Sequence, residues 1–298
     1  MVTGGSGSHD PAPHTHPGRT PLGPGRELAY PREVTHAGFV PVDEGELFYV
    51  RDGSGPAVVL AHGAPILDHR QWDGQVEALS KRHTVVRYDL RGYGRSSVPT
   101  ERAYRHCDDL AALITGLGFD GAVVGGESFG AMVAIDATLA YPGLVDALIL
   151  DATVPLTGWD WVEELPVAPA LRLARTEDLD TITGAFVNLP LFEAARERPN
   201  ALQALETMAA DYGGWHFNHS DPADWAAERA VDRLGEISVP TLVVIGGRDV
   251  LDVRLIAKRL ANEIPNSSKV VLATAGHIPE MEDPQAFNAA VLEFLDNV

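Results

Sequence analysis

The sequence lacks the features that mark disulfide-stabilised, membrane-spanning and secreted proteins. Its 298 residues include a single cysteine, Cys107, so no intrachain disulfide can form, and this residue is expected to be a small apolar side chain on a helix. No apolar run approaches the roughly 18 residues that span a bilayer. The N-terminus has no apolar segment of the kind found in signal peptides. These absences predict a cytoplasmic protein.

Positive charge is also scarce. The chain has 23 lysines and arginines against 42 aspartates and glutamates, which gives a formal net charge of −19. A protein that binds nucleic acid or an anionic membrane surface requires a basic patch, so this composition opposes both kinds of partner. The composition does not decide between a monomer and a homodimer.

Residues 1–27 differ from the rest of the chain because Gly, Pro, Ser, His and Thr dominate them. They carry too little apolar side-chain area to offset the entropy cost of ordering, which predicts a disordered tail. His9, His14 and His16 lie in this tail. Their spacing matches no defined metal site, so no metal is expected there.

The remainder predicts an α/β fold, since apolar runs with the length of strands alternate with amphipathic helical stretches. Runs such as Ala57–Ala61 are typical of strands buried on both faces, and the alternation predicts a mostly parallel sheet with helices on both faces. Residues 155–234 interrupt this pattern with helical stretches and no convincing strand. We therefore predict a helical cap inserted into a core of residues 28–154 and 235–298. Eight strands are expected, at residues 39–42, 47–51, 57–61, 84–89, 122–125, 145–150, 241–245 and 269–272.

A G-x-S-x-G motif at Gly126–Gly130 gives the strongest functional signal. It lies between a predicted strand and a predicted helix, where a serine on a sharp turn is forced into strained backbone geometry and the flanking glycines leave room for the turn. This geometry leaves the serine hydroxyl accessible at the carboxyl edge of the sheet. Ser128 is therefore the predicted nucleophile. Glu127 precedes it, and the sequence leaves open whether this residue is a pocket acid or a buried structural carboxylate.

A serine nucleophile requires a base, and the base requires a carboxylate that orients it. His277 follows the last predicted strand, so it lies on a loop at the same sheet edge. His62 ends an early strand but belongs to another motif, and the other histidines lie in the tail, in the cap, before strands or in or near early helices. Asp249 follows the preceding strand and is preferred over Asp252 and Asp151 as the orienting acid. With an unperturbed imidazole, activity would rise near pH 6.5, roughly the pKa of histidine in model peptides.

Backbone donors are also expected near the nucleophile. The N–H groups of Ala64, just after an early strand, and of Phe129 are predicted to form an oxyanion hole. In the cap, Trp159, Trp215 and His216 are expected to approach the substrate.

From about residue 35 to its end, the chain resembles the α/β-hydrolase fold superfamily. Its C-terminal part is similar to the subgroup of 3-oxoadipate enol-lactonases and cofactor-free haloperoxidases. The resemblance implies a helical cap after the sixth strand, and it implies neither a metal nor an organic cofactor. The matching features are His62–Pro65, Asp89–Ser96, the turn at Ser128, Gly247–Asp249 and Gly276–His277.

The residue at the turn narrows the implied chemistry. Haloalkane dehalogenases and epoxide hydrolases of this fold use an aspartate there, so Ser128 argues against both reactions. We expect hydrolysis of a small-molecule carboxylic ester or lactone through an acyl-enzyme intermediate. Alternatives are carbon–carbon bond hydrolysis and cofactor-free perhydrolase or haloperoxidase activity. A ligand receptor or a non-hydrolytic biosynthetic catalyst is an alternative of another class, because fold does not fix function.

Overall fold

The computed structural model describes residues 36–154, 157–225 and 229–298. The predicted tail, residues 1–27 with His9, His14 and His16, lies outside the described residues. Among the described helices, none combines the length and the apolar character needed to cross a bilayer.

Eight strands form one sheet in the order β1-β2-β4-β3-β5-β6-β7-β8. The pairs β1–β2 and β2–β4 are antiparallel and every later pair is parallel, which confirms the predicted mostly parallel sheet of eight strands. The strands are β1 (His36–Val42), β2 (Gly45–Gly53), β3 (Ala57–Ala61), β4 (Thr84–Tyr88), β5 (Ala122–Glu127), β6 (Val145–Asp151), β7 (Thr241–Gly246) and β8 (Ser267–Leu272).

The central strands are buried on both faces because their side chains alternate between two apolar clusters. In β3, Val58 and Leu60 pack into one cluster, and Val59 packs into the other. Helices α1 (Asp73–Leu79) and α11 (Pro284–Leu295) cover the first face, and α2 (His106–Gly116), α3 (Phe129–Ala140) and α9 (Leu251–Glu263) cover the second. Cys107 is buried in the second cluster.

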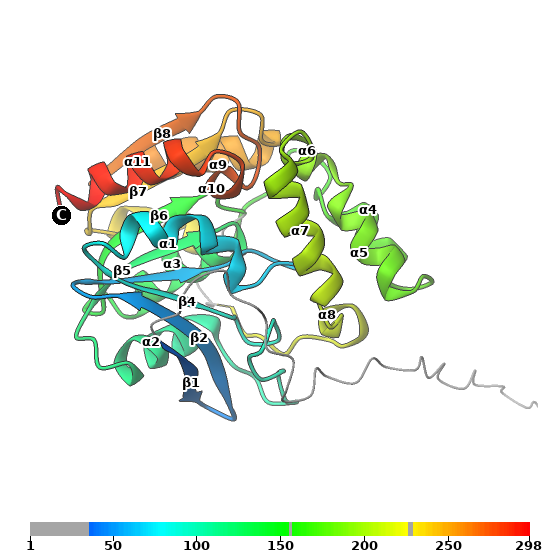
Figure 1. Ribbon diagram of the computed structural model, residues 1–298, viewed down its shortest axis with the longest axis horizontal. Helices are drawn as coiled ribbons and strands as arrows, with labels where there is room; N and C mark the ends of the chain where they lie inside the picture. The colour runs from blue at the N-terminus through cyan, green and yellow to red at the C-terminus, as the bar shows by residue number, and fades with distance from the viewer. Residues whose placement is uncertain (1–35, 155–156, 226–228) are drawn as a thin grey trace, which may run out of the picture. The chain divides into compact units, whose positions relative to one another are not determined.

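Between β6 and β7, the described residues form helices and no strand. Figure 1 shows these helices gathered beside one end of the sheet. We call the described residues 157–225 and 229–236 the cap segment. Its apolar side chains, among them Phe186 and Leu205, belong to the same cluster as the sheet face under α3. The helices are α4 (Ala168–Leu173), α5 (Leu179–Val187), η2 (Pro190–Phe192), α6 (Glu193–Arg196), α7 (Pro199–Asp211), α8 (Trp215–Asn218), η3 (Ala230–Asp232) and η4 (Leu234–Glu236).

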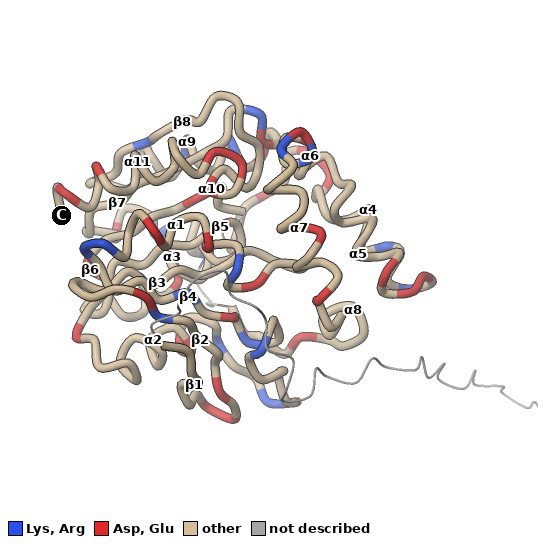
Figure 2. The backbone as a smooth tube through the Cα atoms, in the orientation of Figure 1, with Lys and Arg blue, Asp and Glu red and all other residues tan. Residues whose placement is uncertain are grey.

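Two short helices complete the elements that surround the sheet's carboxyl edge. η1 (His69–Trp72) precedes α1, and α10 (Pro279–Glu282) precedes α11. Both touch α7 of the cap segment. Figure 2 shows that Asp and Glu residues occur along the backbone of the sheet part and of the cap segment alike.

Candidate active site

Ser128 sits on the turn between β5 and α3 in a strained backbone conformation. Its φ is 52° and its ψ is −114°, a region that residues other than glycine rarely adopt. The two glycines of the motif make this turn possible. A Cβ at Gly126 would overlap the backbone of Gly130, and a Cβ at Gly130 would overlap the carbonyl of Ala61 on β3. The serine is thus held by close backbone packing at the end of the sheet.

The structure brings Ser128, His277 and Asp249 together. His277 Nε2 lies 3.1 Å from Ser128 Oγ, and His277 Nδ1 lies 2.9 Å from Asp249 Oδ2. The three residues retain 5%, 2% and 4% of their exposure, respectively. Each comes from a loop that follows a different parallel strand, so the sheet edge positions all three. This geometry allows the imidazole to take the serine proton while the carboxylate orients the ring.

The two competing aspartates have other partners. Asp252 accepts hydrogen bonds from the Trp159 indole N–H and from the backbone N–H groups of Val162 and Glu163, at 2.8–3.0 Å. It therefore fastens the start of the cap segment to α9. Asp151 ends β6, where its fully buried carboxyl group interacts with that of Glu280.

The groups around His277 shift its pKa away from the ordinary value that the sequence analysis assumed. Burial by itself lowers the pKa of this imidazole, but the facing carboxyl groups of Asp249, Glu127 and Glu280 outweigh burial and raise the pKa to about 9. The expectation of a transition near pH 6.5 is therefore wrong for the resting protein. The physical reason is the charge of Asp249, whose effect on the pKa the expectation left out, together with the buried acids Glu127 and Glu280.

The N–H groups of Ala64 and Phe129 are the expected oxyanion donors. Within the described chain, no acceptor takes either N–H, and Phe129 is the first residue of α3, where helical N–H groups lack partners. His62 shapes the first loop. Its Nδ1 is 2.6 Å from the Gly63 carbonyl, and its Nε2 accepts the N–H of Leu90. Burial lowers the pKa of His62, which suits this neutral bridging role.

Glu127 is a functional-site residue whose role the sequence left open. Its side chain is fully buried, and Oε1 lies 3.4 Å from His277 Nε2. Its other oxygen, Oε2, accepts a 2.9 Å hydrogen bond from Gln71 Nε2. The same nitrogen of Gln71 also donates to Glu280 Oε1 at 2.7 Å. Gln71 and Glu280 are site neighbours that sequence reasoning missed, because they lie on η1 and α10, 209 residues apart.

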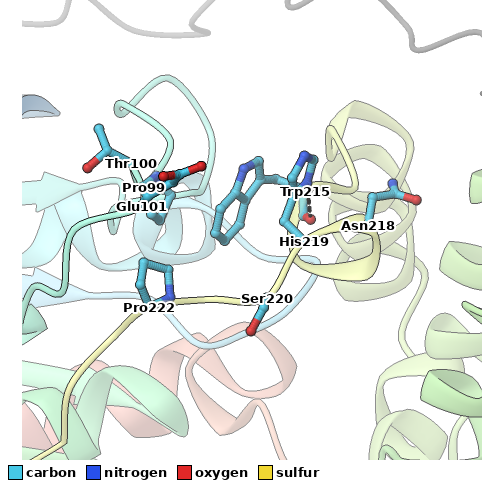
Figure 3. A pocket seen from close by; sticks show the side chains of 8 residues that line it. All are labelled: Pro99, Thr100, Glu101, Trp215, Asn218, His219, Ser220 and Pro222. Atoms are coloured by element: carbon cyan, nitrogen blue, oxygen red, sulfur yellow. Dashed lines mark hydrogen bonds between the residues drawn. The ribbon is translucent and has the colours of Figure 1, made fainter.

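The predicted cap residues lie in three different surroundings. Trp159 is bonded to Asp252, as described above. Trp215 lines a surface hollow of about 700 Å³ together with Pro99–Glu101, residues 218–220 and Pro222 (Figure 3). His216 lies nearer the loop His62–Pro65, which carries Ala64 and is called the oxyanion loop below. Its ring stacks on Tyr93 at 4.2 Å, and Tyr93 in turn contacts His62. Substrate binding by these three residues stays a prediction.

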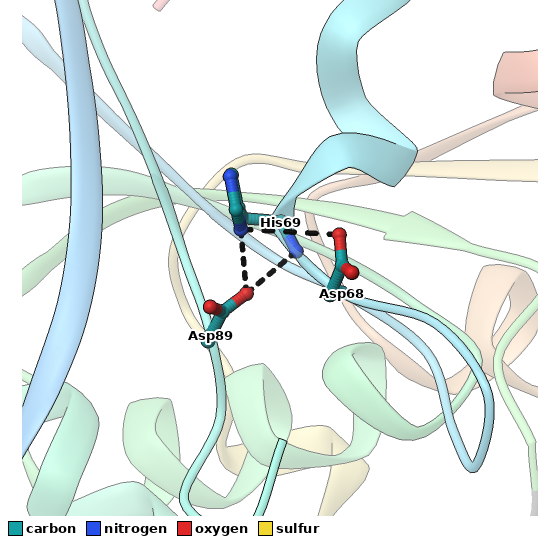
Figure 4. Close-up of side chains that lie close together, drawn as sticks. All are labelled: Asp68, His69 and Asp89. Atoms are coloured by element: carbon teal, nitrogen blue, oxygen red, sulfur yellow. Dashed lines mark hydrogen bonds and ion pairs between the residues drawn. The ribbon is translucent and has the colours of Figure 1, made fainter. Parts of the chain in front are cut away.

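Asp68, His69 and Asp89 form a buried cluster whose potential ligand atoms all lie within 4.8 Å of one another (Figure 4). The protein itself uses these atoms. Asp89 Oδ1 accepts from the backbone N–H of His69 and lies 2.6 Å from its Nδ1. Asp68 accepts hydrogen bonds from the guanidinium of Arg70. The cluster is therefore an internal ion-pair network, and its donor atoms are already engaged.

Comparison with known proteins agrees with this architecture. Residues 58–290 match the family described as the alpha/beta hydrolase family. A proposed carbamate hydrolase of Agrobacterium fabrum, RutD, is 31% identical over 256 residues, which cover 82% of this chain and 94% of that protein. A thermophilic esterase from Thermogutta terrifontis has a similar structure, with a TM-score of 0.71, 28% identity and coverage of 88% and 98%. The enol-lactonase of Burkholderia xenovorans gives a TM-score of 0.70, 26% identity and coverage of 87% and 100%.

Proposed function

The chain belongs to the α/β-hydrolase family, and from this premise we propose that it is a serine hydrolase of small-molecule carboxylic esters or lactones. The observation that carries the proposal is the continuous contact from Ser128 Oγ to His277 Nε2 and from His277 Nδ1 to Asp249. The esterase and the enol-lactonase among the structural relatives support an ester or lactone bond as the target. Membership of the family supports hydrolase activity.

The first half of the reaction forms an acyl-enzyme. Ser128 Oγ attacks the carbonyl carbon while His277 Nε2 takes the hydroxyl proton. The carbonyl oxygen becomes an oxyanion that faces the N–H groups of Ala64 and Phe129. The intermediate then collapses, the bond to the alkoxy oxygen breaks, and His277 returns its proton to that oxygen. In a lactone, the leaving hydroxyl remains part of the acyl group.

The second half restores the enzyme. A water molecule gives a proton to His277 Nε2 and attacks the acyl carbon, and the second tetrahedral intermediate again places its oxyanion against the two N–H groups. Its collapse breaks the bond to Ser128 Oγ, which recovers the proton from His277, and the carboxylic acid leaves. Asp249 orients the ring and stabilises its charged form in both halves.

A fluorophosphonate probe tests the nucleophile directly. We expect intact-mass measurement to show one adduct on the wild-type protein and none on Ser128→Ala, because only an activated serine reacts. Ser220→Ala, which removes a serine from the surface hollow, is the matched control and should label like wild type. Labelling of folded Ser128→Ala would refute the assignment.

A panel of esters and lactones then tests the bond type. We expect turnover of at least one class, and we expect Ser128→Ala to lose it by several orders of magnitude while circular dichroism shows an unchanged fold. An adduct on Ser128 without turnover of any ester or lactone would favour carbon–carbon bond hydrolysis or perhydrolysis. No adduct on the folded wild-type protein would favour a ligand receptor or a non-hydrolytic catalyst.

A further inference from the structure

His277 has a carboxyl group beside each of its ring nitrogens. Asp249 lies at Nδ1, as the orienting acid of the site, and Glu127 Oε1 lies 3.4 Å from Nε2. Nε2 is the nitrogen that faces Ser128 Oγ, so Glu127 reaches the side of the ring where the proton moves. Glu127 is fully buried, and Oε1 has no hydrogen-bond partner among the described residues.

Glu127 is held in this position by a hydrogen-bonded hub. The Gln71 side chain accepts the Gly63 N–H at 2.8 Å and donates to Glu127 Oε2 and Glu280 Oε1, so its amide is fully engaged. Gly63 is also needed sterically, since a Cβ at this position would overlap Glu127 Oε2. The oxyanion loop, Glu127 and α10 are thus fixed relative to one another through one amide group.

We propose that Glu127 is a positioning residue of the reaction, which holds the Nε2 side of the His277 ring and stabilises the imidazolium formed when Ser128 gives up its proton. The proposal rests on the hydrolase function proposed above. In the acylation step, the proton passes from Ser128 Oγ to Nε2, and Oε1 offers a lone pair beside the new N–H.

The surrounding groups act on the charge of Glu127 in opposite directions, and the assignment rests on the geometry given above. The groups that face Glu127 and His277 are Asp249 after β7, Asp151 at the end of β6, and Glu280 and Glu282 on α10. Burial raises the pKa of Glu127 well above its ordinary range, and the neighbouring acids add to the rise, whereas the charge of His277 lowers it. The charged forms of Glu127 and His277 therefore favour each other.

The test is an NMR titration of the His277 ring, assigned by its loss in His277→Asn, in wild type and in Glu127→Gln. We expect the pKa of His277 to fall by about one unit or more in Glu127→Gln, because the amide cannot supply the carboxylate that stabilises the imidazolium. Asp136→Asn is the matched control, since Asp136 is another buried acid, on α3, whose pKa burial raises to about 6. It should leave the His277 titration unchanged.

An unchanged His277 pKa in folded Glu127→Gln would overturn the proposal. Should Glu127→Gln fail to fold, Glu127→Asp carries the test, because it withdraws the carboxyl group by one methylene; a His277 pKa equal to wild type would again overturn it. The titration requires no turnover. Failure of the proposed hydrolase function would instead appear as absent probe labelling and absent turnover, so the two failures are distinguishable.

The pH dependence of p-nitrophenyl acetate hydrolysis gives a second readout. In Glu127→Gln we expect kcat to fall more than KM changes, because Glu127 touches the ring and not the ester. The acid limb of kcat/KM should move to lower pH, since a lower pKa makes the ring neutral at lower pH. A fall in kcat with an unmoved acid limb would indicate a merely structural role and would refute the proposal.

Discussion

The sheet edge and the cap segment are packed against the same apolar cluster, yet polar contacts of different kinds fix them in place. At the sheet edge, Ser128, His277 and Asp249 bond to one another, and all are nearly fully buried. The cap segment is fastened to the core by bonds that end on its backbone and surface, such as those from Asp252 and the Arg70–Asp211 ion pair. The sheet edge thus brings reactive side chains into contact with one another, whereas the polar contacts of the cap segment hold it against the core.

The largest expected effect separates two aspartates that lie three residues apart. Asp249→Asn should lower kcat by about 10⁴-fold, because the amide no longer holds His277 in the tautomer that accepts the serine proton. Asp252→Asn, the matched control, should keep kcat within a few-fold. Steady-state rates on an activated ester measure both. Equal losses of kcat in the two variants would contradict the distinction between Asp249, which orients the base, and Asp252, which holds the cap segment.

The pH dependence of kcat/KM should identify His277, at the sheet edge, as the base. Only a neutral His277 accepts the serine proton, and its pKa is raised to about 9, so kcat/KM should increase with pH up to about that value. The measurement is ester hydrolysis between about pH 6 and 10, corrected for spontaneous hydrolysis. His216→Gln in the cap should leave this limb in place, since burial lowers the pKa of His216 to about 4. A limb that moves in His216→Gln would contradict the assignment.

The free energy of unfolding should change most when the hydrogen bonds between Asp252 and the cap segment are removed. Asp252→Ala leaves two backbone N–H groups and the Trp159 indole without their acceptor, and we expect a loss of about 2–3 kcal/mol in the free energy of unfolding. Urea denaturation measures this loss. Trp159→Phe removes one of the three bonds and should cost about 1 kcal/mol. A loss for Asp252→Ala no larger than that for Trp159→Phe would show that the backbone bonds contribute little.

The smallest effect is expected at the ion pair between η1 and α7. Arg70 Nη1 and Asp211 Oδ2 are 2.8 Å apart, and both side chains are partly exposed. A double-mutant cycle with Arg70→Met and Asp211→Asn should give a coupling of about 1 kcal/mol or less. The coupling should shrink in high salt because solvent-exposed charges are screened. A coupling that is insensitive to salt would indicate packing in place of ion pairing.

Periodicity and position were sufficient to predict the frame of the site. The run Ala57–Ala61 became β3 with the expected bounds, and the strand–turn–helix context placed Ser128 between β5 and α3. His277 and Asp249 could be chosen because parallel strands deliver their following loops to one edge of a sheet. These inferences depend only on local pattern and on the direction of the strands.

The network behind the base could not be predicted in the same way. Gln71, Glu127 and Glu280 come from three distant elements, and their contacts depend on side-chain conformations that no local pattern encodes. The raised pKa of His277 follows first from Asp249, which was predicted as its partner, while the further contributions of Glu127 and Glu280 were missed with these contacts. Asp252 was interpreted as a rival acid because it is close to Asp249 in sequence. It lies in the first turn of α9, however, where its carboxylate accepts hydrogen bonds from the cap segment.

The contact between Gly130 and the Ala61 carbonyl has a consequence for directed evolution. It couples the nucleophile turn to the strand that precedes the oxyanion loop, with no room for a side chain between them. Libraries that vary residues 126 or 130 should therefore yield few folded members, even where the new residue is small. Diversity introduced at Trp215, residues 218–220 and Pro222, around the surface hollow, leaves that junction intact and offers a place to search for altered substrate preference.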